Sequence, residues 1–332
     1  MKEITIGKNQ CGQRLDKFLA KVLREAPKSF LYKMMRKKNI KLNGKRAQGN
    51  EKLNEGDVVA MYLSEETLAK FSGAADGKVR SLVENTGTPL DIIYENEHIA
   101  LINKPAGLLS QKAKPDDVSL VELFTQYAGA REEGFSPGIC NRLDRNTSGI
   151  VVAGKTLFGL QVMSQMFRDR QIKKYYLAVV EGVVEQDFTA EGYLRRDEKR
   201  NQSQLFDTQV PGSSYIKTGY KPLECDGTYT LLRVQLFTGK THQIRSHLSS
   251  LSHPIVGDVK YGGGVLGCVR RQLLHAYEIA FPEMDEPFRD LSGRRFFAAV
   301  PNDFYKVGNF SFNLEERMRE NETGSDAICK RI

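Results

Sequence analysis

Apolar residues near the start of the chain recur at the spacing of an amphipathic helix. Five of them stand at i, i+3, i+4, i+7 and i+8, which predicts a helix with one buried face that ends before Pro27. These five are Leu15, Phe18, Leu19, Val22 and Leu23. Ser29 is a suitable N-cap for a second helix, which we expect to begin at Phe30.

Basic residues gather on this second helix and on a hairpin predicted after it. Three are spaced at i, i+3 and i+4 and therefore share one helix face. Two more stand at the tip of an Asn-Gly hairpin turn within residues 40–46, and a further turn and strand follow over residues 53–63. These candidate RNA-binding residues are Lys33, Arg36 and Lys37 on the helix and Lys45 and Arg46 on the hairpin.

The pattern divides the chain into a small domain, a linker, a larger domain and a tail. Residues 1–63 are expected to form a small α/β domain. Residues 64–88 lose periodicity and predict a flexible linker with a helical turn near residues 65–71. The larger domain occupies residues 89–310, and the polar residues 311–332 predict a loose helix or a disordered tail.

Strand patterns dominate the larger domain, with a few helices between them. The expected strands cover residues 91–94, 98–102, 150–153, 173–180 and 230–236. The expected helices cover residues 120–127, after a capping box of Ser119 and Glu122, and residues 157–170 and 241–251. Because strands and helices do not alternate regularly, we expect an α+β domain around a mixed, largely antiparallel sheet with flanking helices.

The positive charge is concentrated in the small domain. The chain has a net charge of +8. Residues 1–63 hold 15 Lys and Arg against 6 Asp and Glu, a net of +9, and the remainder holds 34 against 35, a net of −1. This asymmetry indicates a polyanion-binding module joined to an electrically balanced domain.

Several other classes of protein are disfavoured by composition. No apolar run approaches the roughly 18 residues that span a bilayer, and the first residues lack the apolar core of a signal peptide. Five scattered cysteines without a Cys-x-x-Cys pair argue against a disulfide framework. His242 and His247 are five positions apart, which does not suit a zinc site on one helix face. We therefore expect a cytoplasmic protein without a bound metal.

One turn concentrates the candidate chemistry. Residues 141–149 read Asn-Arg-Leu-Asp-Arg-Asn-Thr-Ser-Gly and lead into an apolar run, which predicts a polar turn that feeds a strand. The turn positions the Asp144 carboxylate between Arg142 and Arg145. A single aspartate in a turn is most often a simple turn cap, so the assignment depends on the whole string.

This string resembles the catalytic loop of the RluA-type pseudouridine synthases, which isomerise uridine within RNA. Five further strings occur in the order of that family, namely Asn103-Lys104-Pro105-x-Gly107, Lys174-x-Tyr176-x-Ala178, Gly239-Lys240-Thr241-His242-Gln243-Ile244-Arg245-x-His247, His253-Pro254-Ile255-x-Gly257-Asp258 and Leu274-His275-Ala276. Residues 11–63 are similar to the RNA-binding domain first seen in small-subunit ribosomal protein S-four.

The resemblance implies a role for each of four residues. Asp144 corresponds to the essential catalytic carboxylate, and Arg245 to the arginine that pairs with it. Tyr176 corresponds to the tyrosine that packs against the target base. Arg142 corresponds to the arginine that lies against RNA and fills the space of the flipped nucleotide. The family usually has histidine where this chain has Asn141, which bears on the subfamily and on the target.

The implied substrate is large-subunit ribosomal RNA, with transfer RNA as the alternative, and the default oligomeric state is a monomer. Pseudouridylation breaks the glycosidic bond, rotates the uracil and rejoins it through carbon, so we expect neither cofactor nor metal. The carboxylate can act as a nucleophile or can take a proton from the sugar, and both routes stay open. A uridine in a duplex must first be flipped out, at a cost of roughly a few kcal/mol.

Two other functions fit parts of the sequence. The basic module alone suits a non-catalytic RNA-binding or ribosome-assembly protein, although Asp144, Tyr176 and Arg245 speak for catalysis. Residues 149–156 also match the phosphate-loop pattern of nucleotidases. The four residues 150–153 between its glycines, three of which are β-branched, prefer an extended strand, so we expect a strand there and no phosphate loop.

Overall fold

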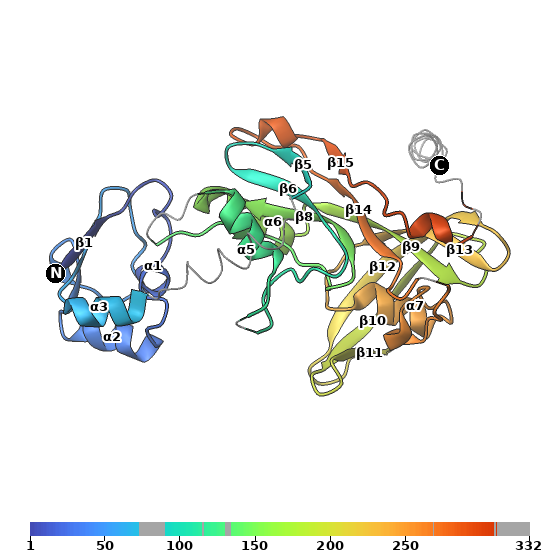
Figure 1. Cartoon of the computed structure of the whole chain (residues 1–332), viewed down its shortest axis with the longest axis horizontal. Coiled ribbons are helices and arrows are strands. Elements are labelled where there is room, and N and C mark those ends of the chain that lie inside the picture. Colours follow the sequence, from blue (N-terminus) through green and yellow to red (C-terminus); the bar gives the residue numbers. More distant parts are fainter. Residues whose placement is uncertain (73–89, 115, 130–133, 268, 309, 311–332) are drawn as a thin grey trace. The chain divides into compact units, whose positions relative to one another are not determined.

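The computed structural model describes most of the chain (Figure 1), and it divides into two compact units. The first unit is Met1–Ile172 with Glu278–Ala298, and the second is Lys173–Tyr277 with Ala299–Ile332. The expected linker after Ser72 and the expected tail lie outside the described residues. The described residues are 1–72, 90–114, 116–129, 134–267, 269–308 and 310.

The N-terminal module combines a four-stranded sheet with three helices. The sheet has the order β1-β4-β2-β3 and its pairings are antiparallel. Its strands are β1 (Lys2–Thr5), β2 (Ile40–Leu42), β3 (Lys45–Arg46) and β4 (Val58–Met61). Its helices are α1 (Leu15–Val22), α2 (Lys28–Arg36) and α3 (Glu65–Ser72).

The apolar pattern accounts for α1, whereas the expected start of α2 is wrong. Four of the five predicted residues of α1 lie on its buried face, and the fifth, Leu23, is buried directly after it. Helix α2 begins at Lys28 with Pro27 at the N-cap, so Ser29 lies inside the helix. The reason is that the carbonyl of Pro27 accepts hydrogen bonds from the backbone N–H groups of Phe30 and Leu31.

The Asn-Gly hairpin forms as predicted, and α3 belongs to the module. Asn43 and Gly44 have φ angles of 49° and 72°, the left-handed values that such a two-residue turn requires. Leu68 and Phe71 of α3 pack against the core of the module, and the carbonyl of Phe71 accepts a hydrogen bond from the N–H of Glu25. The helical turn expected near residues 65–71 is thus an eight-residue helix.

Over its described residues, the rest of the first unit is a group of antiparallel strands with two α-helices. β6 pairs with both β5 and β8, which run side by side with it in Figure 1, and β7 pairs with β8. The strands are β5 (Ile92–Glu95), β6 (Ile99–Lys104), β7 (Gly138–Ile139), β8 (Ser148–Gly154) and β15 (Arg295–Phe297). The helices are α5 (Leu120–Tyr127) and α6 (Leu157–Arg168).

Helix α5 begins after Ser119 as predicted, but the side-chain cap expected from the capping box does not form. The Ser119 hydroxyl donates to the carboxylate of Glu122 and caps no backbone N–H. The Glu122 carboxylate is a strong acceptor, and the Ser119 hydroxyl is directed at it and not at the first backbone N–H groups of the helix. Helix α6 does receive a side-chain cap, because Thr156 accepts a hydrogen bond from the N–H of Gly159.

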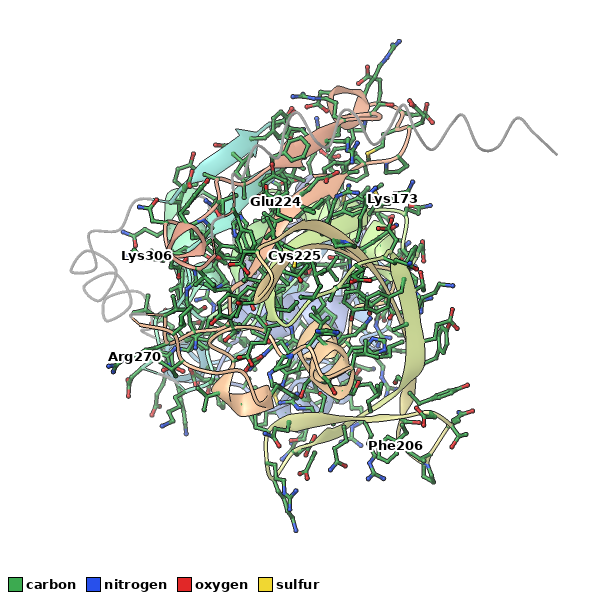
Figure 2. All side chains as sticks on the ribbon, turned by 90° about the vertical axis from the view of Figure 1, so that its right-hand side faces the viewer. Lys173, Phe206, Glu224, Cys225, Arg270 and Lys306 are labelled. Atoms are coloured by element: carbon green, nitrogen blue, oxygen red, sulfur yellow. The ribbon has the colours of Figure 1, made fainter. Side chains whose placement is uncertain are left out.

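In the part of the chain that the structure describes, the second unit is built from long antiparallel strands and one α-helix, with two short 3-10 helices. The strand order is β11-β10-β12-β13-β9, and every pairing along it is antiparallel. Figure 2 labels Lys173 at the start of β9 and Phe206 at the end of β11. The elements are β9 (Lys173–Glu181), β10 (Phe188–Asp197), β11 (Gln202–Phe206), β12 (Ser214–Cys225), β13 (Tyr229–Leu236) and α7 (Gln243–Ser250).

The fold class is confirmed as α+β with a large, mostly antiparallel sheet. The strands outside the N-terminal module belong to one 11-stranded sheet. β14 (Leu274–Ala280), which pairs with β15, carries the chain from the second unit back to the first. Three short 3-10 helices complete the description: η1 (Val259–Tyr261), η2 (Arg289–Leu291) and η3 (Phe304–Lys306). Over the described ranges, no helix is long and apolar enough to cross a membrane.

Candidate active site

Asp144 lies in a tight turn between β7 and β8 of the first unit. The carbonyl of Asp144 accepts a hydrogen bond of 3.1 Å from the N–H of Thr147, which closes the turn. Leu143 and Thr147 are buried, Asp144 is half-buried and Arg142 is exposed. The turn is therefore anchored by buried residues on both sides of Asp144, while the Asp144 and Arg142 side chains remain accessible to solvent.

A buried lysine supports the turn from the end of β6. The Lys104 side chain is fully buried, and its Nζ donates to the carbonyls of Pro105, Leu108 and Arg145 at 2.9, 2.8 and 3.1 Å. Gly107 and Arg145 add two bonds, Gly107 N–H to the Arg145 carbonyl at 2.9 Å and Arg145 Nε to the Gly107 carbonyl at 3.0 Å. Three carbonyl acceptors match the three protons of an ammonium group and offset its desolvation.

The residues that match a phosphate loop form a strand, as predicted. Residues 149–154 belong to β8, every residue of which is buried, and they pair with β6. Lys155 contacts the carboxylate of Glu95 and donates to the carbonyl of Asn96 at 2.9 Å. Backbone amides that are committed to a sheet cannot curl around a phosphate, so the phosphate-loop interpretation is rejected.

Tyr176 and Arg245 both belong to the second unit. Tyr176 lies on β9 opposite Val234 of β13, and its side chain is buried. Arg245 lies in the first turns of α7, which follows His242 in the left-handed region at φ 58°. The structure thus places Arg142 and Asp144 on one turn of the first unit, and Tyr176 and Arg245 on two elements of the second.

Arg245 forms a buried, two-pronged ion pair with Asp258. Its Nε lies 2.6 Å from Oδ2 and its Nη2 lies 2.7 Å from Oδ1. Only 7% of the arginine side chain and 2% of the aspartate side chain are exposed. Parallel N–H to oxygen bonds of this kind fix the plane of a guanidinium as well as its position. The predicted pairing of Arg245 with Asp144 stays a prediction.

Tyr261 completes the surroundings of Arg245. The guanidinium carbon lies 4.9 Å from the centre of the Tyr261 ring. The Tyr261 hydroxyl accepts a bond of 2.8 Å from the N–H of Ser203 and lies 2.9 Å from Nδ1 of His242. Burial raises the pKa of Tyr261. Asp258 and Tyr261 were not predicted as partners of Arg245 from the sequence, although Asp258 closes one of the motif strings that carry the resemblance.

The five basic residues expected to bind RNA are all exposed on the N-terminal module. Lys33 and Arg36 lie on the outer face of α2, and Lys37 follows directly as its C-cap. Lys45 and Arg46 form β3, at the tip of the Asn-Gly hairpin. Meanwhile Leu31, Met34 and Met35 fill the buried face of the same helix. The alternation of buried apolar and exposed basic side chains agrees with a cationic helix face.

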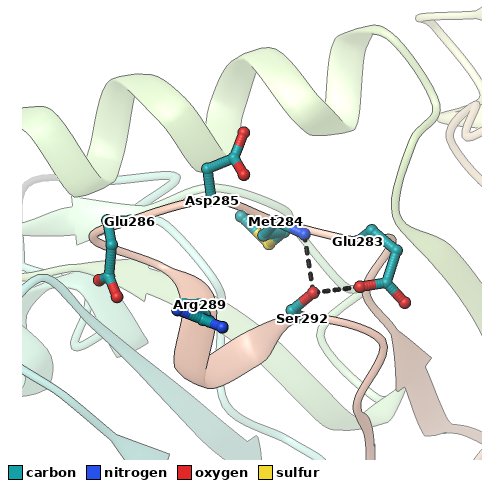
Figure 3. A pocket seen from close by; sticks show the side chains of 6 residues that line it. All are labelled: Glu283, Met284, Asp285, Glu286, Arg289 and Ser292. Atoms are coloured by element: carbon teal, nitrogen blue, oxygen red, sulfur yellow. Dashed lines mark hydrogen bonds between the residues drawn. The ribbon is translucent and has the colours of Figure 1, made fainter.

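A hollow in the first unit has the wrong charge for RNA. It measures about 810 Å³ and follows β14, around η2 (Figure 3). The Ser292 hydroxyl accepts a bond of 2.9 Å from the N–H of Met284 and donates to the Glu283 carboxylate. Three carboxylates against one guanidinium would repel a polyanion. The lining residues are Glu283, Met284, Asp285, Glu286, Arg289 and Ser292. Among the described residues, no group of three or more His, Cys, Asp or Glu is placed to hold a metal ion.

Family models match two parts of the chain. Residues 98–250 match the model of the RNA pseudouridylate synthases, and residues 13–59 match the S4 domain. Among solved structures, the human RNA pseudouridylate synthase domain containing 4 has a TM-score of 0.54 at 21% identity. That likeness covers 69% of this chain and 94% of the human one, and it concerns the fold.

Curated relatives match over most of their length. The chain is 31% identical to ribosomal large subunit pseudouridine synthase D of Xylella fastidiosa over 92% of this chain and 91% of the relative. It is 33% identical to the synthase D of Escherichia coli over 78% and 76%. It is 30% identical to the synthase C of Vibrio parahaemolyticus over 85% and 90%. The chain therefore belongs to the RNA pseudouridylate synthase family and is an enzyme, an RNA pseudouridine synthase with an S4 domain.

Proposed function

We propose that this enzyme isomerises specific uridines of large-subunit ribosomal RNA and that Asp144 is its catalytic carboxylate. The names of the relatives support the substrate, because they are ribosomal large subunit pseudouridine synthases. The observation that carries the assignment of Asp144 is its half-buried place on a turn whose backbone is hydrogen-bonded on both sides. We further propose a monomer that acts in the cytoplasm.

The reaction replaces the bond between the ribose C1′ and the uracil N1 by a bond between C1′ and C5. The C5 proton leaves, N1 gains a proton, and no electrons are exchanged with another molecule. Asp144 acts at the sugar, either as the nucleophile on C1′ or as the base that takes a ribose proton. Both routes need a carboxylate whose position is fixed before the bond breaks, which is what a clamped turn provides.

Three further residues complete the proposed machinery. Tyr176 offers an aromatic face to the extruded uracil. Arg245 is the counter-charge of the reacting carboxylate, and its own orientation is set by Asp258. Arg142 is exposed two residues before Asp144 and fills the space that the flipped nucleotide leaves in the RNA.

The basic face of the N-terminal module binds the RNA backbone without reading its sequence. Each phosphate that a lysine or arginine neutralises releases counterions, so this contribution depends steeply on salt. The exposed set on α2 and β3 supplies such contacts on a module whose net charge is +9 over residues 1–63. A non-catalytic RNA-binding protein would share this property, so catalysis has to be tested at Asp144.

The test compares the wild-type enzyme with Asp144→Asn on a large-subunit ribosomal RNA transcript that carries tritium at C5 of uridine. Formation of the new carbon–carbon bond releases the tritium to water, where it is counted. We expect release by the wild type, none by the variant, and RNA affinities within about twofold of each other, since the amide keeps the size of the side chain. Release by Asp144→Asn at a rate near that of the wild type would refute the assignment.

A further inference from the structure

We propose that Ser110 and Asn141 are positioning residues for Asp144, and that their side chains stand in for backbone hydrogen bonds that the turn itself cannot make. This inference rests on the proposed catalytic role of Asp144. It concerns only the first unit, where all the contacts involved are found.

The Ser110 hydroxyl binds both backbone polar groups of Leu143, the residue before Asp144. It donates to the Leu143 carbonyl at 2.8 Å and accepts from the Leu143 N–H at 3.0 Å. Ser110 is buried, with 5% of its surface exposed, so water cannot easily replace these bonds. The serine is itself fixed, because the preceding Leu109 accepts a backbone bond of 2.8 Å from the N–H of Leu120 at the start of α5.

Asn141 extends the pairing of β7 with β8 past the end of β7. Backbone pairs join Gly138 to Gly154 and Ile139 to Ala153, and the N–H of Cys140 then donates to the Val152 carbonyl at 2.7 Å. At the next position the chain turns away from β8. The Asn141 side chain continues the pairing instead.

Both ends of the Asn141 carboxamide are used. Its Oδ1 accepts from the N–H of Val152 at 2.8 Å, and its Nδ2 donates to the Ile150 carbonyl at 3.4 Å. A carboxamide carries one acceptor and one donor group in the same plane, as a peptide unit does, and can therefore replace one rung of a sheet. Asn141 thus holds the start of the turn on β8, whose first residues form the other end of the turn.

Asp144 is consequently flanked by two residues with fixed backbones. Leu143 is held by Ser110, and the carbonyl of Arg145 is held by Lys104 and Gly107. These contacts leave the backbone of Asp144 little freedom to move. A displacement of about 1 Å at a reacting group can cost on the order of 100-fold in rate, so loss of either clamp should act on turnover more than on RNA binding.

The experiment measures single-turnover rate, RNA affinity and melting temperature for Ser110→Ala, Ser110→Thr and Asn141→Ala on the tritium-labelled transcript. We expect Ser110→Ala and Asn141→Ala to lose about 10- to 100-fold in rate with affinities within about twofold of wild type. Ser110→Thr keeps the hydroxyl and should recover most of the rate.

Thr125→Val is the matched control. Thr125 is also buried in the first unit. Its hydroxyl donates to the Val121 carbonyl inside α5 at 2.7 Å and lies 3.4 Å from the Pro137 carbonyl, and neither partner belongs to the turn that carries Asp144. Its loss should lower the melting temperature while the rate stays within about twofold of wild type.

The inference is overturned if Ser110→Ala and Asn141→Ala react as fast as wild type, or if Thr125→Val loses as much rate as they do. Failure of the proposed function has a different signature. In that case the wild type releases no tritium, or Asp144→Asn releases it equally well.

Discussion

Replacing Asp258 by asparagine removes the negative charge that faces Arg245 and leaves the arginine buried without it. The two side chains are 2% and 7% exposed, so solvent cannot compensate for the loss. Removal of one partner of such a pair typically costs about 3–5 kcal/mol. At about 2–4 °C per kcal/mol for a unit of this order of size, the melting temperature should fall by roughly 6–20 °C.

The assay is thermal unfolding of the wild type beside Asp258→Asn and Asp303→Asn. The second variant breaks the ion pair with Arg271, whose side chains are 17% and 26% exposed, so its cost should stay below about 2 kcal/mol. A double replacement, Arg245→Met with Asp258→Leu, should regain most of the lost stability, because it removes both charges. Equal shifts for the two aspartate variants, or a double variant as unstable as Asp258→Asn, would refute the reasoning from a buried charge.

Three further predictions concern other parts of the chain. Burial lowers the pKa of His247 below its ordinary 6.5, so the folded state binds this proton less readily than the unfolded state does. The neutral imidazole therefore contributes its full stabilisation above about pH 6.5, and this contribution is lost as the pH falls. His247→Gln should therefore lose less melting temperature than wild type between about pH 7.5 and about pH 5.5, and parallel losses would contradict this. Gly257→Ala should fold poorly, because φ is +79° and a Cβ would lie 2.1 Å from the backbone oxygen of Arg271. Gly262→Ala, where φ is +90° and no atom lies within 4 Å of the added Cβ, should lower the free energy of chemical unfolding by only about 1–2 kcal/mol. Similar losses for the two variants would disprove the steric argument. Lys33→Gln with Arg36→Gln should weaken RNA binding and reduce the slope of log affinity against log salt by roughly 1.4–1.8, and an unchanged slope in binding titrations would show that neither residue contacts phosphate.

Elements with a strong apolar period could be predicted from the sequence almost to their ends. Helix α1 follows from its apolar spacing, and the Asn43-Gly44 turn follows from a backbone conformation that few other residue pairs adopt. Capping was harder to predict, because competing bond partners decide it. Pro27 accepts the first helical bonds in place of Ser29, and Ser119 donates to a carboxylate.

Strands β10, β11 and β12 were not predicted from the sequence. Strand β12 is 12 residues long and contains Gly219 and Pro222, two residues that a strand pattern disfavours, and a register shift follows Pro222. Strand β10 likewise alternates in burial only in part. Long pairing with neighbours stabilises these strands, and that pairing cannot be read from a local window.

In the candidate site, the residues within motif strings could be predicted from the sequence, whereas the contacts that hold them could not. Asp144 and Arg245 could be proposed from the sequence because they lie in dense motif strings. The contacts that position them were not predicted, because Ser110 bonds to Leu143 across 33 positions of the sequence and Asp258 bonds to Arg245 across 13. Only the folded chain shows that Asn141 replaces a backbone rung beside β8.

The most direct test of the central claim is a map of pseudouridine across all cellular RNA after deletion of the gene, with rescue by wild type or by Asp144→Asn. We predict that specific large-subunit ribosomal RNA positions lose pseudouridine on deletion and regain it only with the wild-type gene. Sites in transfer RNA would reassign the substrate while keeping the reaction. If no site changes, or if Asp144→Asn restores the sites as well as wild type does, catalysis through Asp144 is contradicted.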